Sequence, residues 1–185
     1  MLRLLIEHIE VVAAKDLPRF AKLGVIASMM PAHADPGDEP EGGVWSKKVG
    51  AERLHRAFAF RSLEKAHAKL AFGSAWPVVG VNPLPAIAVA VTRQNSSGKP
   101  PKGWIPEQRI SMDSALRGFT AGAAYAVRLD DRVGVLKPGM DADLVVLSKG
   151  ADLAKPASLF AAKVDLTVAA GRVVYERHSP LAGGN

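Results

Sequence analysis

The first two thirds of the chain alternate short apolar runs with amphipathic stretches, which is typical of βα units. Apolar runs at residues 2–6, 25–30 and 69–73 predict three short strands. The first run ends at polar Glu7 and His8, so we expect a strand that is buried on both faces and carries chemistry at its carboxyl end. This pattern predicts a parallel α/β arrangement.

Helical patterns follow these runs. An apolar stripe from Val12 to Leu23 predicts a helix with Pro18 in its first turn and Gly24 as its stop. Residues 51–68 predict one or two helices, residues 83–91 predict another, and Ser111 can cap a helix that runs toward residue 125. Residues 31–48 and 94–108 show no periodicity, and we expect long loops there.

The pattern changes near residue 130. Residues 142–147, 164–168 and 172–176 predict strands, with a turn at Gly171. We therefore expect an α/β unit over residues 1–130, a β unit over residues 131–178 and a tail over residues 179–185.

The amino-acid composition limits the kinds of site and partner that the chain can have. The chain has 185 residues, 48% of them hydrophobic and 23% charged, as in a folded protein. It has no Cys, so disulfides and thiolate metal sites are excluded and any metal must be held by His and carboxylate side chains. Its net charge of +6 raises the alternative of nucleic-acid binding. The basic residues are scattered, however, and we expect no nucleic-acid partner.

No apolar stretch approaches the ~20 residues of a bilayer-spanning helix, so no membrane association is expected. Glu7, His8 and Glu10 interrupt the first apolar run before a signal peptide can develop. The expected location is cytoplasmic.

The histidines divide into two groups. His55 and His67 lie in charged helical patterns and His178 lies near the end of the chain, so all three are expected at the surface. His8 and His33 each follow a predicted strand, and the carboxyl ends of parallel strands form the active-site edge of many α/β proteins. From the pattern alone, His8 is as compatible with a structural role as with a metal-ligand role.

Several motifs together resemble the amidohydrolase superfamily, in its family 3 branch, which includes N-substituted formamide deformylases. The motifs are Ile6-Glu7-His8, Pro31-Ala32-His33, Ala71-Phe72-Gly73-Ser74, Asn82-Pro83-Leu84, Lys137-Pro138-Gly139 and Ala142-Asp143-Leu144. The resemblance implies the C-terminal part, about strands 6 to 8, of a TIM-like metal-dependent hydrolase barrel. The last strands would belong to a small composite β-sandwich.

The resemblance also implies roles for individual residues. His8 matches a metal ligand, His33 matches a substrate-binding position, and Ala75 stands where the family has a catalytic Asp. The implied cofactor is a divalent metal, with zinc expected, and the implied substrate is a small molecule with an amide-type carbon–nitrogen bond. The alternative is a degenerate, non-catalytic domain that binds a ligand or a partner.

The family's remaining metal ligands have no counterpart in this sequence. We therefore expect the isolated chain to be inactive and to bind no stoichiometric metal. A TIM barrel closes eight strands over ~250 residues, so three strands would leave open edges and apolar faces. A complementary N-terminal half chain or a second copy would be needed to cover them.

Overall fold

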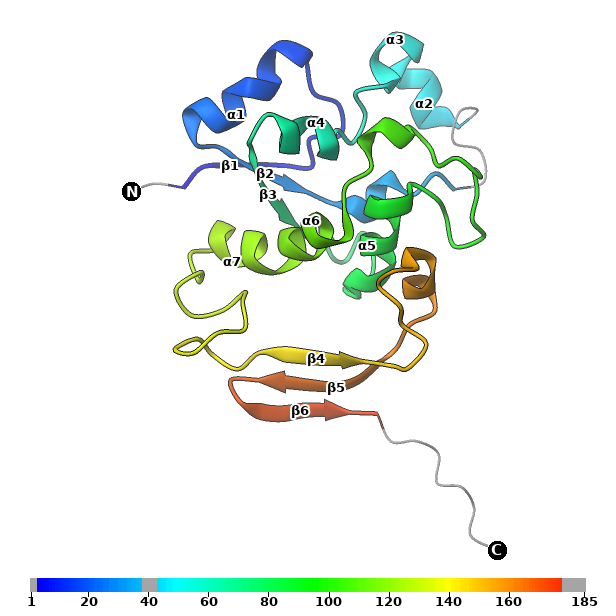
Figure 1. The fold of residues 1–185 in the computed structure, drawn as a ribbon. Coiled ribbons are helices and arrows are strands. Elements are labelled where there is room, and N and C mark those ends of the chain that lie inside the picture. Colours follow the sequence, from blue (N-terminus) through cyan, green and yellow to red (C-terminus); the bar gives the residue numbers. More distant parts are fainter. Residues whose placement is uncertain (1–2, 38–42, 178–185) are drawn as a thin grey trace, which may run out of the picture.

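The computed structural model describes residues 3–37 and 43–177, which contain two sheets (Figure 1). The strands β1 (Leu5–Glu7), β2 (Ile26–Met29) and β3 (Lys69–Phe72) form a parallel sheet in that order. The strands β4 (Leu144–Leu147), β5 (Val164–Ala169) and β6 (Arg172–Glu176) form an antiparallel sheet. The predicted parallel and all-β parts are therefore both present in this mixed α/β fold.

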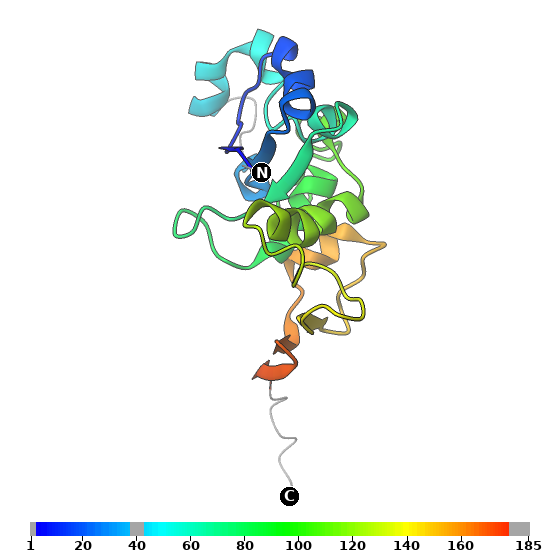
Figure 2. The ribbon, with the colours of Figure 1, turned by 90° about the vertical axis from the view of Figure 1, so that its left-hand side faces the viewer.

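Short helices connect the strands. They are α1 (Leu17–Leu23), α2 (Val44–Val49), α3 (Ala51–Leu54), α4 (Phe60–Lys65), α5 (Pro83–Thr92), α6 (Met112–Arg117) and α7 (Ala123–Ala126). The single turns are the 3₁₀ segments η1 (Ala14–Asp16), η2 (Pro31–Ala34), η3 (Pro106–Gln108) and η5 (Pro156–Phe160), and the π-helical η4 (Gly118–Gly122). In two perpendicular views, α6 and α7 lie between the parallel sheet and the antiparallel sheet (Figures 1 and 2).

The predicted roles of Gly24 and Ser111 at helix ends are observed, and Asn82 caps a third helix. Gly24 ends α1 with a φ of 67°, in the left-handed region that glycine tolerates. The Asn82 side chain accepts a hydrogen bond from the Leu84 N–H at 3.1 Å at the start of α5. Ser111 Oγ accepts one from the Ser114 N–H at 3.0 Å at the start of α6. Local chemistry therefore fixes where these helices begin and end.

The core gathers around α5, which is apolar on most of its surface. Ile87 and Val89 of α5 are buried, as are Phe60 and Leu63 of α4 and Phe72 of β3. The Phe72 ring packs edge-on against Phe60, with ring centroids 5.6 Å apart. This core holds the parallel strands, and so the loops at their carboxyl ends, in place.

Three expectations from the sequence are wrong in detail. The strand β1 is exposed along its length, with Ile6 at 51% exposure, because within the described residues it pairs only with β2. Val12 is buried but lies outside α1, which begins at Leu17. The segment 31–48, expected as a loop, contains η2 and α2, while residues 38–42 lie outside the described residues.

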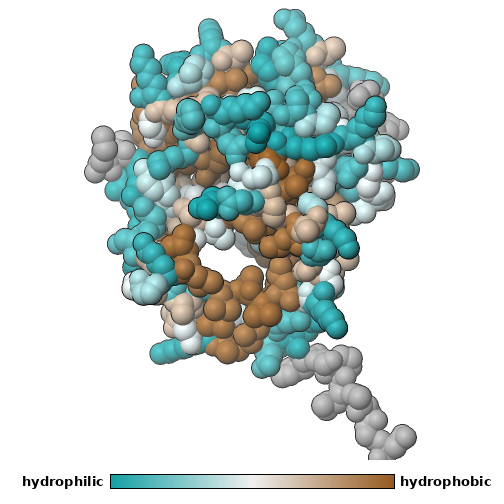
Figure 3. Space-filling view, viewed as in Figure 1, coloured by the Kyte–Doolittle hydropathy of each residue, from teal (hydrophilic) through white to brown (hydrophobic). Residues whose placement is uncertain are grey.

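The antiparallel sheet leaves a large apolar space against the helices. A cavity of about 930 Å³ is lined by α6, α7, residues 133–136, β4 and β5. Figure 3 shows hydrophobic side chains around this opening. Leu136 is 69% exposed and Val145 is 54% exposed, in line with the expected open apolar faces. The division at residue 130 stays a prediction, and His178 and the tail 179–185 lie outside the described residues.

Within the part of the chain that the structure describes, no helix combines the length and the apolar character needed to span a bilayer.

Candidate metal centre

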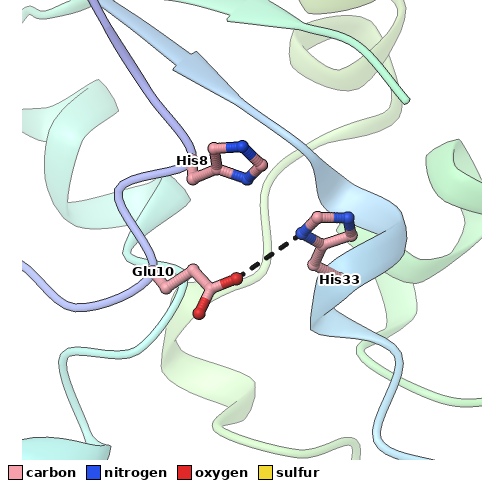
Figure 4. A group of neighbouring side chains, drawn as sticks. All are labelled: His8, Glu10 and His33. Atoms are coloured by element: carbon pink, nitrogen blue, oxygen red, sulfur yellow. Dashed lines mark ion pairs between the residues drawn. The ribbon is translucent and has the colours of Figure 1, made fainter. Parts of the chain in front are cut away.

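Three side chains with metal-binding chemistry meet at the carboxyl edge of the parallel sheet (Figure 4). His8 and Glu10 lie in the loop after β1, and His33 lies in η2, just after β2. Each offers one ligand atom, and these atoms all lie within 4.8 Å of one another. Because β1 and β2 are parallel neighbours, their following loops meet at this edge.

Glu10 and His33 form an ion-pair contact within this cluster. Glu10 Oε1 lies 3.5 Å from His33 Nδ1. The His8 and His33 rings are stacked, with centroids 5.4 Å apart and planes inclined by 22°. The three side chains therefore face a common point, and none is turned away from the others.

The surroundings fix the carboxylate more firmly than they fix His8. The Trp45 indole N–H donates a hydrogen bond to Glu10 Oε2 at 3.1 Å, which leaves Oε1 directed toward His33. The His33 side chain is only 15% exposed, and its Nε2 is buried without a hydrogen-bond partner among the described residues. The His8 side chain is exposed and has more freedom to move.

An unusual backbone turn creates this arrangement. His8 and Ile9 both have positive φ angles, 66° and 51°. Positive φ is uncommon outside glycine and is a true outlier for a β-branched residue such as Ile9. The Ile9 N–H closes the turn by donating to the Glu7 carbonyl oxygen at 2.8 Å. Such strain persists where the surrounding structure enforces it, and it is common at functional sites.

A cavity of about 440 Å³ adjoins the cluster and includes Glu10 and His33 in its lining. Its aromatic walls are Trp45, Phe58 and Trp104. The Trp45 ring stacks on Phe58 at 5.3 Å and meets Trp104 edge-on at 6.0 Å. The volume is in the range of small-molecule sites, which are typically apolar with a few polar groups.

A buried cation holds two of these walls together. The Arg93 side chain is fully buried and donates to the Trp104 carbonyl oxygen at 2.9 Å and to the Phe58 carbonyl oxygen at 3.3 Å. Burial lowers the pKa of its guanidinium, while the charge of nearby Glu107 opposes that shift. The aromatic rings around the guanidinium add cation–π attraction.

The donor set suits a divalent cation. Two imidazoles and one carboxylate are ligands that zinc and other transition metals accept. Their spacing also fits, since ligand atoms about 2.1 Å from a tetrahedral ion lie roughly 3.4 Å apart, close to the separation of Glu10 Oε1 and His33 Nδ1.

The structure brings together two of the three residues singled out from the sequence. His8 and His33 meet in the cluster, whereas Ala75 lies beyond the end of β3, and its methyl group offers no ligand atom. His55 and His67 are exposed, as expected. Glu10 was missed as a site residue, because the turn that directs it toward His33 depends on the positive φ angles of His8 and Ile9.

Comparison with known proteins assigns the chain to a family. Residues 2–175 match the sequence profile of the Amidohydrolase family, in its family 3 form. The chain therefore belongs to the amidohydrolase family. A specific likeness to the N-substituted formamide deformylases within that family stays a prediction.

Two curated relatives illustrate the match. LONG AFTER FAR-RED 3 of Arabidopsis thaliana is 42% identical over 151 residues, which cover 79% of this chain and 24% of that protein. A Bacillus subtilis (strain 168) protein classed as an amidohydrolase, YtcJ, is 28% identical over 171 residues, covering 92% of this chain and 31% of that protein. The chain thus spans a quarter to a third of the length of these relatives.

Solved structures share the fold. An uncharacterized metal-dependent hydrolase from Pyrococcus horikoshii has a TM-score of 0.61 at 27% identity, covering 75% of this chain and 27% of that one. Atrazine chlorohydrolase TrzN from Arthrobacter aurescens TC1, solved with zinc, has a TM-score of 0.62 at 23% identity, covering 97% of this chain and 38% of that one. Both share the mixed α/β architecture described above.

Proposed function

We propose that this chain forms part of a metal-dependent hydrolase that cleaves carbon–nitrogen bonds, other than peptide bonds, in small amide-type molecules. The observation that carries the proposal is the meeting of His8, Glu10 and His33 at the carboxyl edge of a parallel sheet, beside a cavity of small-molecule size. Membership of the amidohydrolase family supports the same class of reaction.

The architecture that we propose is the C-terminal part, about strands 6 to 8, of a TIM-like barrel, followed by strands of a composite β-sandwich. The parallel order of β1, β2 and β3 supports the first part, and the antiparallel β4–β6 sheet supports the second. The exposed β1 and the open space beside β4 and β5 would then be covered by a complementary N-terminal half chain or by a second copy.

The chemistry follows from the donor set. A divalent ion such as Zn²⁺, when bound, polarises an amide carbonyl and lowers the pKa of water toward ~7. His8 would be a ligand to this ion, and His33 lies close enough to contact either the ion or the substrate. Trp45 would hold the Glu10 carboxylate in position through its indole N–H. The aromatic walls would exclude water and bind a flat or apolar substrate group.

Ala75 makes the isolated chain a poor catalyst in this proposal. It occupies the position where the resemblance implies a carboxylate, and its methyl group can neither accept nor donate a proton. Loss of a general acid or base costs typically 10²–10⁴ in rate. We therefore expect no measurable amide hydrolysis by the chain alone. The same residue supports the alternative of a degenerate domain that binds a ligand or a partner without catalysis.

The test combines the chain with the N-terminal part of an amidohydrolase relative, in forms with Ala75 and with Ala75→Asp. Hydrolysis of a panel of N-formyl and N-acetyl amines is measured with zinc present. We expect turnover with Ala75→Asp and its loss on adding His8→Ala, whereas His55→Ala is the matched control. If Ala75→Asp stays inactive while the assembled protein is folded and metal-loaded, the hydrolase proposal fails and the binding alternative is favoured.

A further inference from the structure

We propose that Arg93 is a positioning residue, which fixes both the backbone and the carboxylate of Glu10 through two residues of the aromatic cavity wall. Arg93 itself neither lines the cavity nor belongs to the cluster of candidate ligands. It acts through Phe58 and Trp104, whose carbonyl oxygens accept its hydrogen bonds. The reaction that Arg93 serves is the proposed function, and to that extent the inference rests on it, although the positioning can be measured without turnover.

The first connection from Arg93 to Glu10 runs through the backbone. Arg93 Nη1 donates to the Phe58 carbonyl oxygen at 3.3 Å, and the Phe58 N–H donates to the Glu10 carbonyl oxygen at 2.8 Å. An isolated antiparallel bridge between Val11 and Ala57 joins the same two segments. The loop after β1 that carries Glu10 is therefore attached to a segment that Arg93 holds.

The second connection reaches the Glu10 carboxylate. Arg93 Nε donates to the Trp104 carbonyl oxygen at 2.9 Å, and the Trp104 N–H donates to the Arg93 carbonyl oxygen at 2.7 Å. The Trp104 ring meets Trp45 edge-on at 6.0 Å, and the Trp45 indole N–H donates to Glu10 Oε2 at 3.1 Å. The Trp45 ring also stacks on Phe58, so both connections meet at this indole.

The choice of an arginine follows from the need to hold two carbonyl oxygens at once. A guanidinium presents several N–H donors in fixed directions, whereas the ammonium group of Lys is a single point charge. The Arg93 side chain is fully buried, and burial lowers the pKa of its guanidinium to about 9. A buried cation is costly, and an apolar side chain of similar volume would avoid that cost. The two hydrogen bonds to the wall account for the charge at this position.

The backbone is strained at the points where Arg93 is bonded to the wall. Arg93 and Phe58 have φ angles of 58° and 49°, and Ile105, next to Trp104, has a φ angle of 52°. Positive φ is an outlier for bulky or β-branched residues. Such conformations persist only where the surrounding structure enforces them, and they cluster at functional sites. The hydrogen bonds of Arg93 supply that enforcement.

The experiment follows the tryptophan indole N–H groups of the full chain by NMR in Arg93→Met. Methionine fills much of the same space but has no donor, so the hydrogen bond between Trp45 and Glu10 should weaken. We expect the Trp45 indole N–H to exchange with solvent at least ~10-fold faster, and its signal to move toward its position in Glu10→Ala. The indole of Trp76, which is exposed, should not change.

Leu159→Ala is the matched control for a general loss of stability. Leu159 is fully buried in η5, which packs on α5, and its removal takes away none of these hydrogen bonds. It should leave the Trp45 indole signal in place. If Leu159→Ala speeds the exchange as much as Arg93→Met does, or if Arg93→Met leaves the Trp45 indole unchanged, the proposal is overturned.

Chemical rescue separates positioning from a general structural role. Arg93→Ala leaves room for a free guanidinium ion, so millimolar guanidinium chloride should restore slow exchange of the Trp45 indole. Sodium chloride at the same concentration should have no such effect. Arg93→Lys should restore little, because one ammonium group cannot serve both carbonyl oxygens. Failure of guanidinium to restore slow exchange would count against the proposal.

A measurement on the unaltered chain keeps the test decisive if the variants fail to fold. The Arg93 Nε–H, the Phe58 amide and the Trp45 indole should show similar protection from hydrogen exchange, as members of one cooperative unit. An unprotected Trp45 indole beside a protected Arg93 Nε–H would contradict the proposal.

Turnover distinguishes this proposal from the proposed function. In the assembled Ala75→Asp protein, Arg93→Met should lower kcat by ~10²-fold and change KM less, because a misplacement of about 1 Å has an effect of this order. If that protein is inactive even with Arg93 while the Trp45 results hold, the hydrolase proposal fails and the positioning of Glu10 stands. If Arg93→Met hydrolyses amides at an unchanged rate, the hydrolase proposal stands and the positioning role is rejected.

Discussion

Gly122 lies where the helical segment η4 crosses the strand β3, and it provides a sharp test of the packing described above. A Cβ added at this position would overlap with the Leu70 carbonyl oxygen, well inside the 3.0 Å below which real Cβ contacts essentially never occur. The obstacle is strand backbone and cannot rotate aside. Gly122→Ala must therefore push η4 away from β3.

Two opposing effects determine how much Gly122→Ala changes the free energy of unfolding. Alanine in place of glycine within a helix contributes up to ~1 kcal/mol in favour of folding. Overpacking a close contact costs typically ~1–3 kcal/mol, and a rigid backbone obstacle favours the upper end. We expect Gly122→Ala to lower the free energy of unfolding by about 1–2 kcal/mol. For a chain of this length, that corresponds to a drop in Tm of roughly 2–8 °C.

The measurement is urea unfolding followed by circular dichroism, with a thermal scan as a second readout. Gly150→Ala is the matched control, because a Cβ there meets nothing within 4 Å. The control should stay within about 0.5–1 kcal/mol of the unaltered chain. If Gly122→Ala is as stable as the control, the close approach of η4 to β3 is wrong.

Three further predictions concern caps and charges. Asn82→Ala should cost about 1 kcal/mol of stability by removing the α5 cap, seen as a lower urea midpoint, whereas Asn82→Ser should not. Arg93→Met should cost about 2 kcal/mol, because the buried Trp104 carbonyl oxygen loses its donor and the Phe58 carbonyl oxygen keeps only the Phe60 N–H; equal or higher thermal stability would contradict this. The hydrogen bond from Arg3 lowers the pKa of Asp130. The interaction between the two side chains therefore stabilises the folded chain fully above the ordinary carboxyl pKa, and this stabilisation is lost as the pH falls through the lowered pKa. The urea midpoint of Asp130→Asn should therefore lie below that of the unaltered chain at pH 7 and approach it in acid, and a gap independent of pH would refute the pairing.

Much of the fold follows from patterns that act over a few residues. The runs that became β2 and β3 are mostly apolar, α1 ends at Gly24, and α5 begins after the Asn82 cap. In contrast, α2 is only six residues long, too short for an amphipathic repeat to be visible. The exposure of β1 could not be predicted from its composition, because the exposed fraction of a strand depends on which elements pack beside it.

The candidate site also combines features that the sequence predicts with features that depend on the folded structure. His8 and His33 could be placed at one edge because each follows a parallel strand. The role of Glu10 depends on left-handed angles at His8 and Ile9, which side-chain preferences argue against and no sequence pattern predicts. Trp45 and Glu10 are distant in the sequence, so the hydrogen bond between them could not be predicted from the sequence either.

The pairing of β1 with β2 gives the cluster a role in the alignment of the sheet. Glu7 lies opposite Ser28, and the Ser28 hydroxyl donates to its carboxylate at 2.8 Å. A slip of one residue would turn alternate side chains to the opposite face and carry His8 and Glu10 away from His33. Any ion or molecule that contacts the loops after β1 and β2 therefore favours one register. It also stabilises the edge strand β1, which makes few other contacts.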